Sequence, residues 1–156
     1  MCIGQIITTI VLGGISMSSP VPFASDEWVE CFRDACNNST AYRQAAKNWE
    51  GDFYFIVEPD TPNQDPIYMY LDLYHGQCRK AYIPRNRDGL NPEFSVSGSL
   101  QVWQAIAQKK MDPVKALLTR KLSVTGNMAK IMKNVKAANE LVNCTTAIDT
   151  EFPLDL

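Results

Sequence analysis

The spacing of apolar residues changes twice along the chain, and this change limits the possible folds more than any other feature. Apolar residues recur at helical intervals from residue 26 to 47, alternate with polar residues in several runs between 49 and 97, and return to helical spacing after Gly98. The alternation is clearest over residues 67–74, where every second residue is apolar, as in a strand with one buried face. Strands in one run, with helices before and after them, predict an α+β fold in which helices pack on one face of a mainly antiparallel sheet.

Capping and turn residues set the limits of the individual elements. Ser25 is a good N-cap for the first helix, and Asp112 is a capping residue followed by proline at the first helical position. The segment His75-Gly76-Gln77 is typical of a tight turn between two strands. The predicted helices cover residues 26–37, 40–47, 100–107, 113–118 and 127–142, and the predicted strands cover residues 49–57, 67–74, 78–83, 93–97 and 121–125.

The two ends of the chain differ in character from its middle. Residues 2–15 are apolar and uncharged, but they are too few to span a membrane and lack the basic start of a signal peptide. We expect Met17 to be a natural start and residues 1–16 an upstream extension, with a weak export signal as the alternative. The predicted organisation is a disordered leader over residues 1–24, one domain over residues 25–149 and a tail over residues 150–156.

Size, net charge and cysteine content narrow the class of protein. A chain of 156 residues fits one domain, and its net charge of −2 argues against a general nucleic-acid binder, which is usually strongly basic. The five cysteines are odd in number and include no Cys-x-x-Cys pair, so we expect reduced thiols and a cytoplasmic location. Nothing in the sequence specifies an oligomeric state.

The sequence shows no catalytic or metal-binding constellation. Its single histidine, His75, stands in a predicted turn near Cys78, but a Cys–His pair acts as a nucleophile only in a shielded site where a third group orients the histidine. A solvent-exposed histidine is the simpler interpretation. The chain also has no cluster of His, Cys and carboxylates with metal spacing, and no Gly-rich phosphate loop after a strand. We therefore expect no catalytic residues, no metal and no cofactor, with an enzyme built on Cys78 and His75 as the minor alternative.

Charge is distributed unevenly along the chain. Residues 99–140 contain eight Lys or Arg side chains against two acidic ones, so the remainder of the chain is acidic. This asymmetry indicates an anionic partner for the C-terminal half, such as a membrane surface or lipid head groups. An ordinary solvated helix face is the alternative interpretation.

Several motifs, in order along the chain, resemble the sterol carrier protein type 2 family. They are the segments Tyr70-Leu-Asp-Leu-Tyr-His-Gly76, Phe94 to Gly98, Ser99 to Trp103, Lys110-Met-Asp-Pro113 and Lys121-Leu-Ser-Val-Thr-Gly-Asn-Met128, within a match over roughly residues 26–148. Two turns depart from the family, which usually has glycine where this chain has Lys109 and Arg120. Because a non-glycine residue at positive φ costs on the order of 1 kcal/mol, we expect these two turns to differ in shape.

The resemblance implies a five-stranded sheet with helices on one face that encloses an apolar tunnel, and a non-enzymatic protein that binds or transfers lipid. The family binds fatty acids, fatty acyl-CoA, phospholipids or sterols. An accessory domain that presents a bound lipid or quinone intermediate to partner enzymes is the alternative. The residues that we expect to line the tunnel are Phe32, Phe53, Phe55, Met69, Trp103, Ile106, Leu118, Met128, Ile131, Met132 and Val135. The residues that we expect to meet an anionic membrane transiently are Lys109, Lys110, Arg120 and Lys121.

Overall fold

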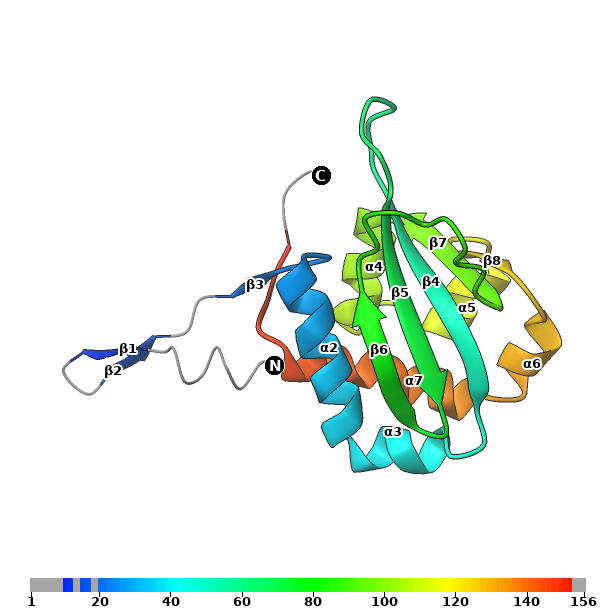
Figure 1. Ribbon diagram of the computed structural model, residues 1–156, viewed down its shortest axis with the longest axis horizontal. Coiled ribbons are helices and arrows are strands. Elements are labelled where there is room, and N and C mark those ends of the chain that lie inside the picture. Colours follow the sequence, from blue (N-terminus) through cyan, green and yellow to red (C-terminus); the bar gives the residue numbers. More distant parts are fainter. Residues whose placement is uncertain (1–9, 13–14, 18–19, 153–156) are drawn as a thin grey trace.

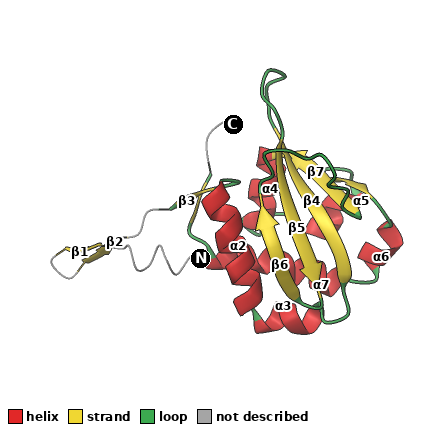
Figure 2. Cartoon of the chain, viewed as in Figure 1, coloured by secondary structure: helices red, strands yellow, loops and turns green. Residues whose placement is uncertain are grey.

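Five strands form one sheet in the order β6-β5-β4-β7-β8. The computed structural model describes residues 10–12, 15–17 and 20–152. The strands are β4 (Glu50–Glu58), β5 (Ile67–Tyr74), β6 (Gln77–Tyr82), β7 (Phe94–Ser99) and β8 (Ser123–Thr125). All neighbours pair antiparallel except β4 and β7, which pair parallel. Figures 1 and 2 show the helices gathered behind this sheet, so the predicted α+β fold with a mainly antiparallel sheet is confirmed.

Most of the helices begin at a side chain that caps them. The N-cap residues Ser25, Ser99 and Asp112 each accept a hydrogen bond from the backbone N–H three residues ahead, which satisfies one of the free donors of a helix start. The helices are α2 (Asp26–Asn38), α3 (Thr40–Ala45), α4 (Leu100–Ala107), α5 (Pro113–Leu118), α6 (Met128–Met132), α7 (Val135–Asn143) and the 3₁₀ turn η1 (Cys144–Ala147). No helix in the described part of the chain is long and apolar enough to cross a membrane.

The continuous helix predicted over residues 127–142 is wrong, because the chain breaks between α6 and α7. Asn134 leaves the helical conformation at φ −122° and ψ 35°. Its side-chain Nδ2 donates a hydrogen bond of 2.8 Å to the carbonyl of Lys130, the group that the Asn134 backbone N–H would use in an unbroken helix. Ile131 of α6 is buried beside this break, whereas the next residue, Met132, is 36% exposed.

The ends of the described core meet each other. Strand β3 (Val21–Pro22) pairs parallel with β9 (Thr150–Glu151), and these residues belong to the predicted leader and tail. The ring of Phe23 contacts the rings of Trp28 and Phe152, at centroid distances of 4.9 and 5.1 Å. Strands β1 (Ile10–Leu12) and β2 (Ile15–Met17) pair with each other, while most of the predicted extension over residues 1–16 lies outside the described residues.

Cysteines contribute to the core rather than to its surface. Cys36, Cys78 and Cys144 are free and buried, as expected of reduced thiols. Cys31 is disulfide-bonded instead, so the prediction of reduced thiols is wrong at that position.

The two turns that depart from the family pattern keep the left-handed conformation that glycine adopts freely. Lys109 has φ 60° and Arg120 has φ 62°. In both turns the next residue closes the same helix-ending hydrogen bond, from Lys110 N to Ala105 O at 2.8 Å and from Lys121 N to Ala116 O at 2.9 Å. Each turn therefore carries the strain of a side chain at positive φ.

We expect Lys109→Gly and Arg120→Gly each to raise the free energy of unfolding by about 0.5–1 kcal/mol, because glycine adopts positive φ without strain. Urea denaturation monitored by circular dichroism measures the change. Lys110→Gly, one residue further along, is the control, since it removes the same side chain at a position without positive φ. A loss of stability in Lys109→Gly equal to that in the control would contradict the strain.

Candidate functional site

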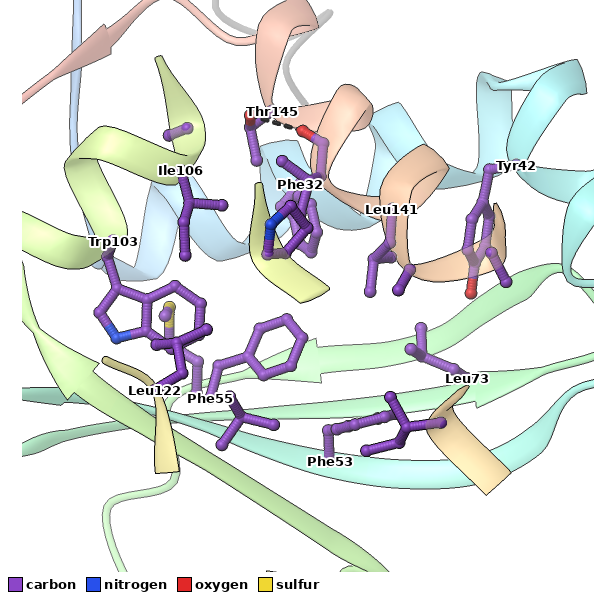
Figure 3. A pocket seen from close by; sticks show the side chains of 18 of the residues that line it. Phe32, Tyr42, Phe53, Phe55, Leu73, Trp103, Ile106, Leu122, Leu141 and Thr145 are labelled. Atoms are coloured by element: carbon purple, nitrogen blue, oxygen red, sulfur yellow. Dashed lines mark hydrogen bonds between the residues drawn. The ribbon is translucent and has the colours of Figure 1, made fainter. Parts of the chain in front are cut away.

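An apolar pocket lies between the inner face of the sheet and the helices (Figure 3). Strands β4, β5 and β7 form its floor, and residues from all the helices described above form its walls and roof. Its cavity volume is about 120 Å³. The pocket arises because alternate strand residues point to one face, where large side chains keep the helices apart from the backbone of the sheet.

Aromatic rings form a continuous chain along the floor of the pocket. Trp49 stacks on Phe53 at a centroid distance of 5.7 Å, and Phe53 contacts Phe55 at 5.4 Å. Phe55 in turn contacts Trp103 of α4 at 5.4 Å, so the chain crosses from the sheet to the helix layer. Such rings offer large, rigid apolar surfaces to a bound molecule.

Seven of the predicted tunnel residues line the pocket: Phe32, Phe53, Phe55, Met69, Trp103, Ile106 and Ile131. The other four, Leu118, Met128, Met132 and Val135, are not among its lining residues. Leu118 is 62% exposed and Met132 is 36% exposed. The break at Asn134 accounts for the position of the residues on and beside α6, whose face a continuous helix would have directed inward.

The sequence did not indicate several other residues that line the pocket. Trp28, Leu73 and Leu141 belong to elements whose apolar face was predicted, so their spacing was a usable signal. Tyr42 lies on the short helix α3, among exposed polar residues, and gave no signal for a binding site.

The pocket offers no charge to a ligand. Its lining residues include no Asp, Glu, Lys, Arg or His. Where polar side chains do contribute, most use their donors on the protein itself: Trp103 Nε1 donates to Ile56 O at 2.9 Å, and Thr145 Oγ1 donates to Val142 O at 2.7 Å. A buried ionised group would find no partner here, so the pocket suits apolar matter.

The pocket is least shielded where α4 and α5 face α7. Most of the half-buried lining residues come from this region: Ala107, Pro113, Leu117, Ala138, Val142 and Thr145. The lining residues Trp49, Phe53 and Leu73 are buried by comparison. Access to the pocket is therefore easiest beside α5.

The four predicted membrane-contact residues lie at the two ends of α5. Lys109 and Lys110 precede this helix, while Arg120 and Lys121 follow it, and all four are exposed. Helix α5 lies between the two pairs and is about 9 Å long, since each residue of a helix adds about 1.5 Å. Within the described part of the chain they form no ion pair. The exposed Leu118 lies between the pairs in the sequence.

The His75 and Cys78 pair does not form a nucleophilic site. The side chain of His75 is 48% exposed, and its Nε2 lies 2.7 Å from Glu50 Oε1. Cys78 is buried, and burial raises the pKa of its thiol to about 12. Since the thiolate is the nucleophile, a thiol with this pKa is unreactive at neutral pH. The described residues also contain no group of His, Cys, Asp and Glu that could hold a metal ion.

Comparison with known proteins identifies the family. The model of the SCP-2 sterol transfer family matches residues 32–139. The chain belongs to this family. The match covers the five-stranded sheet and runs from Phe32 within α2 to Asn139 within α7, so the resemblance that the sequence motifs indicated is confirmed for the SCP-2 domain.

Solved structures agree with this assignment. A crystal structure of sterol carrier protein 2 is 29% identical, with a TM-score of 0.73, covering 81% of this chain and 98% of that one. A solution structure from Thermus thermophilus, described as possibly a sterol carrier protein, is 28% identical, with a TM-score of 0.75, covering 86% and 94%. No curated protein matches the chain.

Of the three free thiols, Cys36, Cys78 and Cys144, we expect the first two, whose pKa is raised by burial, to be unreactive towards Ellman's reagent in the folded protein at pH 8. The pKa of Cys78 of about 12 lowers its thiolate fraction roughly a thousandfold relative to an exposed thiol. Colour development in buffer and in guanidinium chloride measures the reactivity, and all three thiols should react once the chain is unfolded. Rapid labelling of Cys78 in the folded protein would revive the nucleophile that the structure argues against.

Proposed function

We propose that this protein binds one lipid in the apolar pocket and transfers it between membranes, without catalysing a reaction. The carrying observation is a pocket that no Asp, Glu, Lys, Arg or His lines, in a chain of the SCP-2 sterol transfer family. Each methylene group transferred from water into such a pocket stabilises the complex by about 0.8 kcal/mol before ordering costs. A fatty acid, acyl-CoA, phospholipid or sterol-like ligand would bind through this apolar contribution.

The charge distribution sets the orientation of such a ligand. A charged head group would remain at the α5 end, because the lining has no partner for it while Lys109, Lys110, Arg120 and Lys121 lie at the ends of that helix. The apolar part would extend along the aromatic floor, so that the pocket widens into the tunnel that the resemblance implies. This arrangement lets one cavity accept ligands with different head groups.

The same end of the molecule would contact the membrane. Leu118 is exposed beside the four cations, and an apolar side chain flanked by basic residues suits a surface with anionic head groups. Each Lys or Arg near such a surface contributes about 1 kcal/mol, and the attraction decays over a Debye length of about 8 Å at physiological salt. Contact would therefore be weak and reversible. A cytoplasmic location would fit this contact, because the anionic leaflet faces the cytoplasm, whereas the disulfide at Cys31 favours an oxidising compartment.

Filling the pocket tests the binding site. Ala138 lines the pocket and is half-buried, so Ala138→Phe should fill the space and weaken binding of a fluorescent fatty acid by about tenfold or more, at a stability cost of about 1–3 kcal/mol. Ala129→Phe adds the same group at an exposed position of α6 and should bind as wild type does. Fluorescence titration measures both affinities. Equal affinity in the two variants would place the ligand elsewhere.

Removing the cations tests delivery. Changing Lys109, Lys110, Arg120 and Lys121 together to Gln should slow lipid transfer to anionic vesicles severalfold at low salt, with little effect on transfer to neutral vesicles or on ligand affinity. A transfer assay between fluorescent donor and acceptor vesicles measures the rates. The control changes four other exposed lysines to Gln, namely Lys47, Lys80, Lys133 and Lys136.

Equal slowing in the variant and the control would attribute the effect to net charge instead of to this surface. Ligand binding without any transfer by the wild-type protein would favour the accessory role, in which the bound lipid is presented to a partner enzyme.

A further inference from the structure

One polar group on the pocket wall lacks a hydrogen-bond partner: the hydroxyl of Tyr42 on α3. Tyr42 is among the lining residues, and the whole residue is only 2% exposed, so little of its surface reaches water outside the pocket. Figure 3 shows this hydroxyl directed from the helix layer towards the sheet, on the side of Leu73 and Leu141. The structure records no hydrogen bond for it within the described part of the chain.

Each of the other side-chain donor groups on the lining residues makes a hydrogen bond within the protein. The three tryptophans donate their Nε1–H groups to Thr150 Oγ1, Gly51 O and Ile56 O. Asn134 Nδ2 donates one of its two N–H groups to Lys130 O, and Thr145 Oγ1 donates to Val142 O. Of the lining donor groups that the structure describes, the Tyr42 hydroxyl alone makes no hydrogen bond within the protein.

The surroundings of this hydroxyl keep it neutral. Burial raises the pKa of Tyr42, and the buried thiols of Cys36, Cys78 and Cys144 raise it further. It therefore remains an O–H donor at every ordinary pH. Thiols are weak hydrogen-bonding groups, so these neighbours do not replace a proper acceptor.

Tyr42 lies at the far end of the pocket from its least shielded region. Helix α3 packs beside the turn between β5 and β6, where the backbone of Arg43 approaches Gly76 so closely that a Cβ there would lie 2.6 Å from Arg43 O. Helix α4 follows β7 at the opposite end of the sheet (Figure 1). A ligand that enters beside α5 would thus bring its leading end to Tyr42.

We propose that Tyr42 donates a hydrogen bond to a neutral oxygen on the inner end of the bound lipid, and so selects ligands that carry a hydroxyl or ketone there. The proposal rests on the proposed lipid-binding function and adds a specificity residue to it. A carboxylate is excluded from this end, because no cation lines the pocket. A plain hydrocarbon end binds less well than it otherwise could, since it leaves a buried donor unpaired.

A cycle of two proteins and two ligands measures this hydrogen bond. The proteins are wild type and Tyr42→Phe, which removes the hydroxyl and keeps the ring. The ligands are saturated fatty acids of increasing chain length, with and without a hydroxyl on the terminal carbon, so that the carboxylate remains at the α5 end. Competition against a fluorescent fatty acid gives the affinities.

For each protein, the affinity of the hydroxylated ligand is divided by that of the plain ligand. At the chain length that reaches Tyr42, this ratio should be roughly three- to tenfold higher in wild type than in Tyr42→Phe, the usual range for one hydrogen bond. The plain chain should bind Tyr42→Phe at least as tightly as wild type. Tyr54→Phe is the matched control, because Tyr54 is 7% exposed with an unpaired buried hydroxyl but is not a lining residue of the pocket.

The outcomes separate the two proposals. A hydroxyl preference that is equal in wild type and Tyr42→Phe at every chain length overturns the role of Tyr42 while lipid binding stands. The same loss of preference in Tyr54→Phe also overturns it, since the effect would not depend on the pocket. Failure of wild type to bind the fluorescent fatty acid or either ligand series overturns lipid binding itself, and the inference with it.

Discussion

The packing of Phe94 joins the parts of this fold that enclose the pocket. Its ring is fully buried, stacks on Phe53 of the pocket floor at 5.0 Å and contacts Trp49 at 5.5 Å. Gly126, at φ 127°, leads from β8 towards α6, and a Cβ there would lie 2.6 Å from the Phe94 ring. The glycine thus lets the chain pass directly over the ring. Without this close approach, the segment that carries Ile131 could not close its side of the pocket.

A second glycine acts in the same way at the other end of β7. A Cβ on Gly98 would lie 2.5 Å from Leu122 Cδ2, and Leu122 is a lining residue. Gly98 and Gly126 therefore make room for side chains that shape the cavity. Lys109 and Arg120 are the opposite case, because the chain has a side chain at these two positions although their conformation favours glycine. Their charges lie beside α5, where the proposed contact with an anionic membrane would use them at a small cost in stability.

Much of the fold could be predicted because local patterns were strong. Alternation identified β4 and β5 within a residue of their limits, and Ser25 and Asp112 cap the helices that they were expected to cap. The α6–α7 break could not be predicted, because it depends on a side-chain hydrogen bond from Asn134 that competes with a strong apolar period. The prediction of which residues line the pocket was therefore wrong mainly on and beside α6, where that single break changes which residues face the pocket.

The candidate site was harder to predict than the fold, because membership of a pocket depends on which apolar side chains fail to fill space. Phe53 and Phe55 could be assigned from strand parity alone, whereas Tyr42 could not, since an amphipathic residue on a short polar helix usually has its hydroxyl in water. The structure instead encloses that hydroxyl at the end of an apolar cavity whose other polar donors are paired. The tertiary fold determines the order of the chemical groups along the pocket. Cations lie outside it, apolar surface lines its middle, and one neutral donor lies at its inner end. The ligand that we propose, with polarity at both ends and charge at only one of them, would match this order.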